Sequence, residues 1–141
     1  MSSKFIGSSI AGLVVASALI LGCGPDTTGL GTLSVPELAT LLSQGSSVVV
    51  CDANNEETRE KYGVIPGARL LSDHRGYDVA TELPAEKSEK LVFYCSSEAC
   101  SAAPAAARKA VAQGYSDVNV LPAGIKGWVE ADQPTEKPRT G

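Results

Sequence analysis

Hydrophobic and polar positions follow two patterns along the chain, one typical of helices and the other of buried strands. Residues 34–37 (Ser-Val-Pro-Glu) form a capping box with proline in the first helical turn, and Leu38, Leu41 and Leu42 follow at helical spacing. Gly45 can close such a helix. The spacing therefore predicts one amphipathic helix in this part of the chain.

Continuous apolar runs predict strands that are covered on both faces. Residues 47–51 are β-branched almost throughout, residues 90–95 show the strongest strand pattern of the chain, and residues 118–121 form a third run. Residues 69–71 predict a further brief strand. These runs are the expected strands of one sheet.

Helical segments separate the strands. The sequence predicts short helices at residues 56–62 and 78–83, an alanine-rich helix at 101–113 capped by its first serine, and a final short helix at 125–131 in which Trp128 fills the core. Strands that alternate with helices imply an α/β fold with a mostly parallel sheet and helices on both faces.

The first 22 residues have the features of a secretory signal peptide, with one cation, Lys4, before an apolar run at residues 10–21. This run is shorter than a typical spanning helix. Residues 20–23 (Ile-Leu-Gly-Cys) resemble a bacterial lipobox, which implies cleavage before Cys23 and lipid attachment to it. An uncleaved signal anchor with an idle cysteine is the alternative.

The lipid implies a protein anchored to a membrane outside the cytoplasm and facing the periplasm. Gly24 follows the cysteine in place of the aspartate that favours inner-membrane retention, so the outer membrane is the expected location. Residues 23–31 are expected to be a flexible tether, residues 32–133 the folded domain and residues 134–141 a disordered tail.

Composition supports a globular domain and excludes one class of partner. Apolar residues make up 43% of the chain and aromatic residues 5%, so the interior is expected to consist of small aliphatic side chains. The formal net charge is −4. An acidic surface argues against nucleic acid as a partner.

Cys95 has the position of a nucleophile, because it ends the strongest strand and the loop after it leads into a helix. Ligands of parallel sheets bind beyond the carboxyl ends of the strands, and backbone N–H groups of such a loop can converge on a sulfur and favour its thiolate. A buried, inert cysteine is the alternative. The predicted active-site loop consists of Cys95, Ser96, Ser97, Glu98, Ala99, Cys100 and Ser101.

Four pieces of the domain resemble a rhodanese homology domain. The capped helix before residues 48–52 resembles the entry helix and acidic strand end of that family, and residues 62–68 (Tyr-Gly-Val-Ile-Pro-Gly-Ala) resemble its Gly-His-Ile-Pro-Gly-Ala turn, with Val64 for the histidine. Residues 93–95 (Phe-Tyr-Cys) and the six-residue loop after them resemble its active-site segment. Residues 121–128 resemble its terminal Gly-x-x-x-Trp stretch.

The resemblance implies a three-layer rhodanese-like fold with a five-stranded, mostly parallel sheet between helices. It also implies that Cys95 takes sulfur as a persulfide and that the activity is sulfurtransfer from a small sulfur donor to a thiol acceptor. No cofactor is implied, and a monomer is expected.

Two loop positions depart from the Cys-x-x-Gly-x-Arg-Ser pattern that the family often shows. Glu98 stands at the glycine and Cys100 at the arginine, so the loop lacks a fixed cation for thiosulfate and gains a negative charge. Asn54 likewise stands where many relatives have an arginine. A related phosphatase function is not expected, because it requires a longer loop ending in arginine.

The cysteines leave several alternatives open. Without Cys23 their number is odd, and a disulfide between Cys95 and Cys100 is sterically conceivable as a resting form, a resolving step or a thiol–disulfide activity. Cys51 is either core filler, the favoured interpretation, or a second thiol in the same pocket. These cysteines and His74 lack paired metal-ligand spacing, so no metal site is predicted.

Two further polar residues have supporting or solvated roles in this interpretation. Asp52 ends a strand and is predicted to orient loop amides by hydrogen bonds, while His74 is expected to be solvated in a charged loop. The leading hypothesis is a sulfurtransferase that uses Cys95. The alternatives are a non-catalytic binding module of the same fold and a redox protein that uses Cys95 and Cys100.

Overall fold

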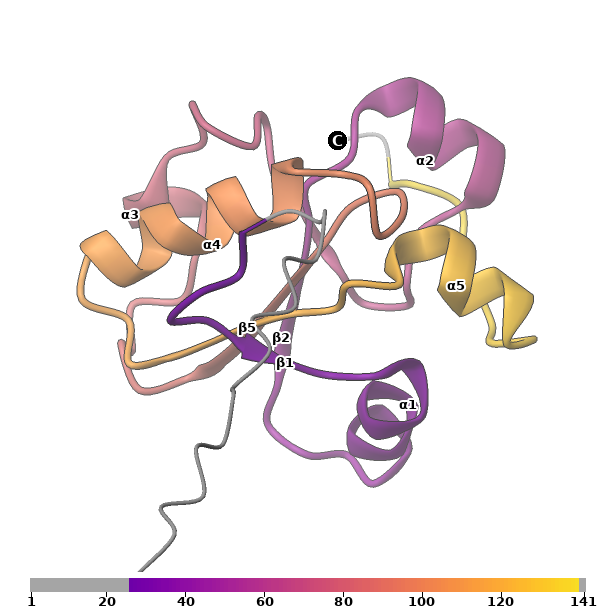
Figure 1. The fold of residues 1–141 in the computed structure, drawn as a ribbon, viewed down its shortest axis with the longest axis horizontal. Coiled ribbons are helices and arrows are strands. Elements are labelled where there is room, and N and C mark those ends of the chain that lie inside the picture. Colours follow the sequence, from indigo (N-terminus) through magenta and orange to yellow (C-terminus); the bar gives the residue numbers. More distant parts are fainter. Residues whose placement is uncertain (1–25, 140–141) are drawn as a thin grey trace, which may run out of the picture.

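The computed structural model describes residues 26–139, and these form one parallel sheet between two groups of helices (Figure 1). The five strands lie in the order β1-β5-β4-β2-β3, and every pair of neighbours is parallel. This confirms the predicted fold class. The strands are β1 Gly31–Thr32, β2 Val49–Asp52, β3 Arg69–Leu70, β4 Lys90–Tyr94 and β5 Asp117–Val120.

The helices begin where local capping signals place them. Glu37 accepts a hydrogen bond from the backbone N–H of Ser34 (2.7 Å), and the Ser34 hydroxyl accepts one from the N–H of Glu37 (3.4 Å), which completes the predicted capping box. Asn55 caps the second helix through the N–H of Thr58 at 2.9 Å. The helices are α1 Val35–Ser43, α2 Glu56–Tyr62, α3 Val79–Glu82, α4 Ala102–Ala112 and α5 Gly124–Glu130.

The fourth helix starts at the predicted place but without the predicted cap. Ser101 is its N-cap residue, yet the Ser101 side chain makes no capping hydrogen bond. The backbone at Ser101 is already helical (φ −94°, ψ −3°), whereas a capping serine normally has an extended backbone that turns its hydroxyl toward the first helical N–H groups. The cap predicted from the sequence is therefore wrong.

Side chains that alternate along the central strands build a separate core on each face of the sheet. Phe93 and Cys95 pack toward the alanine face of α4, whereas Tyr94 packs toward α1 and α5. Figure 1 shows α3 and α4 on one side and α1 and α5 on the other. Trp128 is buried in the second core, as predicted, and its indole N–H donates to the carbonyl of Pro134 at 2.8 Å.

Both ends of the predicted domain extend further than expected. Val64 and Glu136 exchange two backbone hydrogen bonds of 2.9 Å in an antiparallel bridge, so the predicted disordered tail is ordered at its start. At the other end, Gly31 belongs to β1, and Arg108 of α4 binds the carbonyl of Thr28 (3.2 Å). These pairings are made by segments distant in sequence, which a local pattern does not report.

The predicted signal peptide (residues 1–22) and the lipid-attachment residue Cys23 lie outside the described residues. Among residues 26–139, the helices are all too short or too polar to cross a membrane.

Candidate active site

The loop after β4 is held against the start of α5. The carbonyl of Cys95 accepts a hydrogen bond from the N–H of Ile125 (2.8 Å), and that of Ser96 accepts one from Lys126 (3.0 Å). Gly124 makes this approach possible, since a Cβ atom there would lie 2.6 Å from the carbonyl carbon of Ser96. The loop and the terminal helix are therefore fixed to one another.

Cys95 lies just beyond the last residue of β4 and is 2% exposed. The N–H of Ala103, in the first turn of α4, points to its Sγ atom at 3.4 Å. Among the described residues, this is the one backbone N–H within hydrogen-bond distance of the sulfur. The predicted convergence of several loop amides does not occur in this conformation, in which Sγ of Cys95 is bonded to Cys100.

Cys95 and Cys100 form a disulfide, with Cα atoms 6.4 Å apart. The turn between them is closed by a hydrogen bond from the N–H of Cys100 to the carbonyl of Ser97, at 3.0 Å. Cys51 is free and fully buried in the core beneath α4. Of the alternatives for the cysteines, the structure thus pairs the two loop residues and leaves Cys51 in the core.

A cavity of about 220 Å³ opens beside the two loop cysteines. Its lining is mostly apolar, and among the described residues that form it Glu98 alone is charged. Thr27, which precedes β1, contributes to one wall. The lining residues are Thr27, Cys95, Ser97, Glu98, Cys100, Ala103, Pro104, Val120, Leu121 and Pro122.

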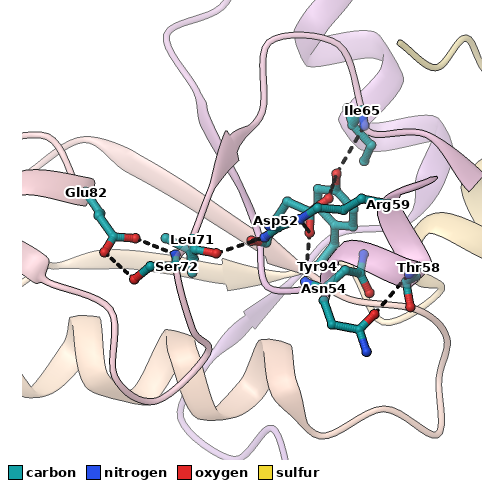
Figure 2. A network of polar contacts seen from close by, with 10 residues as sticks. Asp52, Asn54, Thr58, Arg59, Ile65, Leu71, Ser72, Glu82 and Tyr94 are labelled. Atoms are coloured by element: carbon teal, nitrogen blue, oxygen red, sulfur yellow. Dashed lines mark hydrogen bonds and ion pairs between the residues drawn. The ribbon is translucent and has the colours of Figure 1, made fainter. Parts of the chain in front are cut away.

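Asp52 ends β2 and is the centre of a buried polar network (Figure 2). Its Oδ1 atom accepts hydrogen bonds from the N–H of Asn54 (2.7 Å) and from Nε of Arg59 (3.1 Å), and its Oδ2 atom accepts one from the Tyr94 hydroxyl (2.5 Å). A buried carboxylate needs such partners. The hydrogen bond from the Asn54 N–H is of the type predicted from the sequence, in which Asp52 orients a loop amide.

Arg59 was not singled out in the sequence, which predicted only a short helix at residues 56–62. It is 13% exposed, and its guanidinium also donates to the carbonyls of Asp52 (3.0 Å) and Leu71 (2.9 Å). The available signal was the strand-end aspartate itself, because a buried carboxylate calls for a cation on a neighbouring element. Arg59 thereby joins α2 to the ends of β2 and β3.

The amide of Asn54 is buried beside this network, and its Nδ2 atom has no hydrogen-bond partner among the described residues. Asn54 is the residue that takes the place of the family's second arginine. The structure thus supplies no cation at that position.

Cys51 and His74, for which the sequence favoured a core and a solvated position, are not among the residues that line the cavity. Cys51 is in the core, where burial raises the pKa of its thiol to about 12. His74 lies in the loop between β3 and α3 and is 3.8 Å from Asp73. Within the described part of the chain, no group of three potential ligands is placed to hold a metal ion.

The rhodanese-like domain family matches residues 34–131, whereas no functionally curated protein matches the chain. Similar solved structures include a human single-domain sulfurtransferase (25% identity, TM-score 0.57, covering 72% of this chain and 97% of that one).

Two bacterial structures are also similar. One is the polysulfide-sulfur transferase homodimer of Wolinella succinogenes, with 15% identity and a TM-score of 0.65, covering 77% of this chain and 80% of that one. The other, from Rhodopseudomonas palustris, is described as a possible tyrosine phosphatase. It has 25% identity and a TM-score of 0.64, covering 77% of this chain and 86% of that one.

Proposed function

We propose that this chain, which belongs to the rhodanese-like domain family, is a sulfurtransferase and that Cys95 carries the sulfur. The observation that supports this most directly is the position of Cys95, at the carboxyl end of a central strand and on the wall of the apolar cavity. The sulfurtransferases among the similar structures support the same class of reaction.

The transfer takes place in two displacements once the loop cysteines are reduced. The Cys95 thiolate attacks the outer sulfur of a donor persulfide, so that a new S–S bond forms at Sγ, the donor's S–S bond breaks and the donor leaves as a thiolate. An acceptor thiolate then attacks the outer sulfur of the Cys95 persulfide and takes it. Cys95 is returned as a thiolate.

The charges around the cavity favour donors other than thiosulfate. Glu98 is exposed at its rim, and no Lys or Arg side chain lines it within the described residues. Thiosulfate carries two negative charges and would meet repulsion without a compensating cation. The proposed donors are therefore small persulfides or polysulfides of low charge, and the acceptor is a thiol.

Intact mass spectrometry of the reduced protein tests this proposal. The reduced chain is exposed separately to thiosulfate and to a small persulfide donor, with Cys95→Ser as the control. We expect the persulfide donor to change the mass of the wild type, by one added sulfur atom or by the loss of two hydrogens where the loop cysteines then form their disulfide, and to leave the mass of Cys95→Ser unchanged. Absence of any reaction with either donor would favour a non-catalytic binding module.

A lipid on Cys23 is part of the proposal and is supported by the lipobox-like sequence at residues 20–23. It would anchor the domain outside the cytoplasm, at the outer membrane. The test is cell fractionation of Cys23→Ser, which we expect to move into the soluble fraction. A variant that stays fully membrane-bound would contradict lipid anchorage at this cysteine.

A further inference from the structure

The two loop cysteines are arranged as an attacking and a resolving pair. They are five residues apart, their Cα atoms lie 6.4 Å apart, and the turn closed at Ser97 directs Cys100 back to the sulfur of Cys95. Both line the same cavity. A small molecule bound to Cys95 would therefore lie in a space that Cys100 also reaches.

The third cysteine of the domain does not compete for this role. Cys51 is fully buried, and burial raises the pKa of its thiol to about 12, so it remains protonated at neutral pH. A protonated, inaccessible thiol is a poor nucleophile. Cys100 is partly exposed on the cavity wall and does not share this restriction.

The surroundings of Cys95 offer little to stabilise a long-lived persulfide anion. The described backbone provides a single N–H donor at Sγ, that of Ala103, and the charged side chain on the cavity wall is Glu98. Cys100 occupies the place of a family cation. At the position of the family's arginine, which would bind the transferred sulfur, this loop has a thiol that can displace that sulfur.

We propose that Cys100 resolves the Cys95 persulfide and releases its outer sulfur as hydrosulfide. This inference rests on the proposed sulfur uptake at Cys95 and gives the Cys95 persulfide a second fate beside transfer to an acceptor thiol. The substrate is then a persulfide of low charge, and the products of one turnover are a thiol, hydrosulfide and the oxidised loop.

The step balances in atoms and electrons. The Cys100 thiolate attacks Sγ of Cys95, a Cys95–Cys100 bond forms, and the bond from Sγ to the outer sulfur breaks with its electron pair leaving as HS⁻. The outer sulfur is reduced by one electron and the Cys100 sulfur is oxidised by one, while Sγ of Cys95 exchanges one S–S bond for another and keeps its oxidation state. A dithiol reductant, itself converted to a disulfide, must then restore both thiols.

A single-turnover experiment without reductant tests the resolving step. The full chain, reduced, freed of reductant and kept in detergent, is mixed with one equivalent of an alkyl persulfide generated in situ. Intact mass and trapped hydrosulfide are measured together. We expect wild type to release about one equivalent of hydrosulfide and to end two hydrogens lighter, with no added sulfur.

The matched variants are Cys100→Ser and Cys100→Ala, with Ser46→Ala, at an exposed serine outside the active-site loop, as the control. Both Cys100 variants should retain one added sulfur atom and release less than about a tenth of the hydrosulfide, while Ser46→Ala should behave as wild type. Two different replacements are used so that a folding defect in one still leaves the test intact.

The outcomes separate the two proposals. Wild type that keeps the added sulfur and releases no hydrosulfide overturns the resolving role of Cys100 but leaves sulfur uptake at Cys95 standing. Cys100 variants that gain no sulfur, in a chain with native circular dichroism, overturn the uptake itself. Release of hydrosulfide by the Cys100 variants at the wild-type rate also overturns the resolving role.

Discussion

The hydroxyl of Tyr94 donates a hydrogen bond of 2.5 Å to Oδ2 of Asp52 and accepts one of 3.1 Å from the N–H of Ile65 (Figure 2). Tyr94 ends β4 and Asp52 ends β2, so these two neighbouring strands are joined at their last residues. Burial and the charge of Asp52 raise the pKa of Tyr94, which keeps its hydroxyl a donor. Tyr94 directly precedes Cys95 in the chain, and the two side chains pack on opposite faces of the sheet.

Tyr94→Phe should lower the free energy of unfolding by about 1–3 kcal/mol, because it leaves a buried carboxylate oxygen and the Ile65 N–H without a partner. The measurement is urea unfolding followed by circular dichroism. Tyr62→Phe is the control, since no hydrogen bond of the Tyr62 hydroxyl occurs within the described residues. Equal stability of the two variants would contradict a structural role for the link.

Arg59→Met should lower the free energy of unfolding by about 3–5 kcal/mol, which is more than Tyr94→Phe does. The reason is that the variant leaves the fully buried Asp52 without its cation. Lys61→Met removes an exposed cation from the same helix and should change stability by less than about 1 kcal/mol. Urea unfolding of both variants at pH 7 measures the difference. A loss below 1 kcal/mol for Arg59→Met would show that Asp52 does not depend on this ion pair.

Stability should fall as the pH rises from about 9 to 12, because of Cys51. The unfolded thiol ionises near its ordinary pKa of 9.0, while burial raises the pKa of the folded thiol to about 12. In this window the native state holds the proton that the unfolded state has lost, so unfolding becomes more favourable by up to about 4 kcal/mol. Below about pH 9 the contribution of Cys51 to the free energy of unfolding does not change with pH.

The matched comparison is Cys51→Ala, followed by urea unfolding at several pH values. The stability difference between wild type and variant should shrink as the pH rises, most clearly between pH 9 and 10, before the tyrosines of the unfolded chain ionise. Parallel stability curves would contradict a buried, protonated Cys51. In the native reduced protein at pH 8, iodoacetamide should spare this cysteine.

Gly124→Ala should separate the active-site loop from α5. Its new Cβ atom would lie 2.6 Å from the carbonyl carbon of Ser96, and its backbone has a φ of +63°. Gly114→Ala is the control, because Gly114 also has a positive φ (+94°) but nothing lies within 4 Å of the added atom. We expect the Gly124 variant to lose about 1–3 kcal/mol more stability than the control.

Hydrogen exchange should locate the damage of the Gly124 variant at the N–H groups of Ile125 and Lys126, which bind the loop carbonyls. Sulfur uptake at Cys95 should slow at the same time. Unchanged exchange at these two amides, together with a stability equal to that of Gly114→Ala, would show that the loop can move aside without cost.

The sequence determined the elements whose signals are local. The capping box of α1, the apolar runs of β2, β4 and β5, and the alanine face of α4 each follow from residues close together in the chain. Because strands alternate with helices, the parallel sheet followed from the same pattern, and with it the place of Cys95 at a strand end.

Only the tertiary structure decided which groups meet at that strand end. Arg59 looks like an exposed helix residue until α2 folds over Asp52, and Glu136 pairs with Val64 from 72 positions away in the chain. Cys100 was a possible partner of Cys95 by spacing, but the turn at Ser97 sets the pairing. Such contacts depend on packing between distant segments, whose energies no local pattern contains.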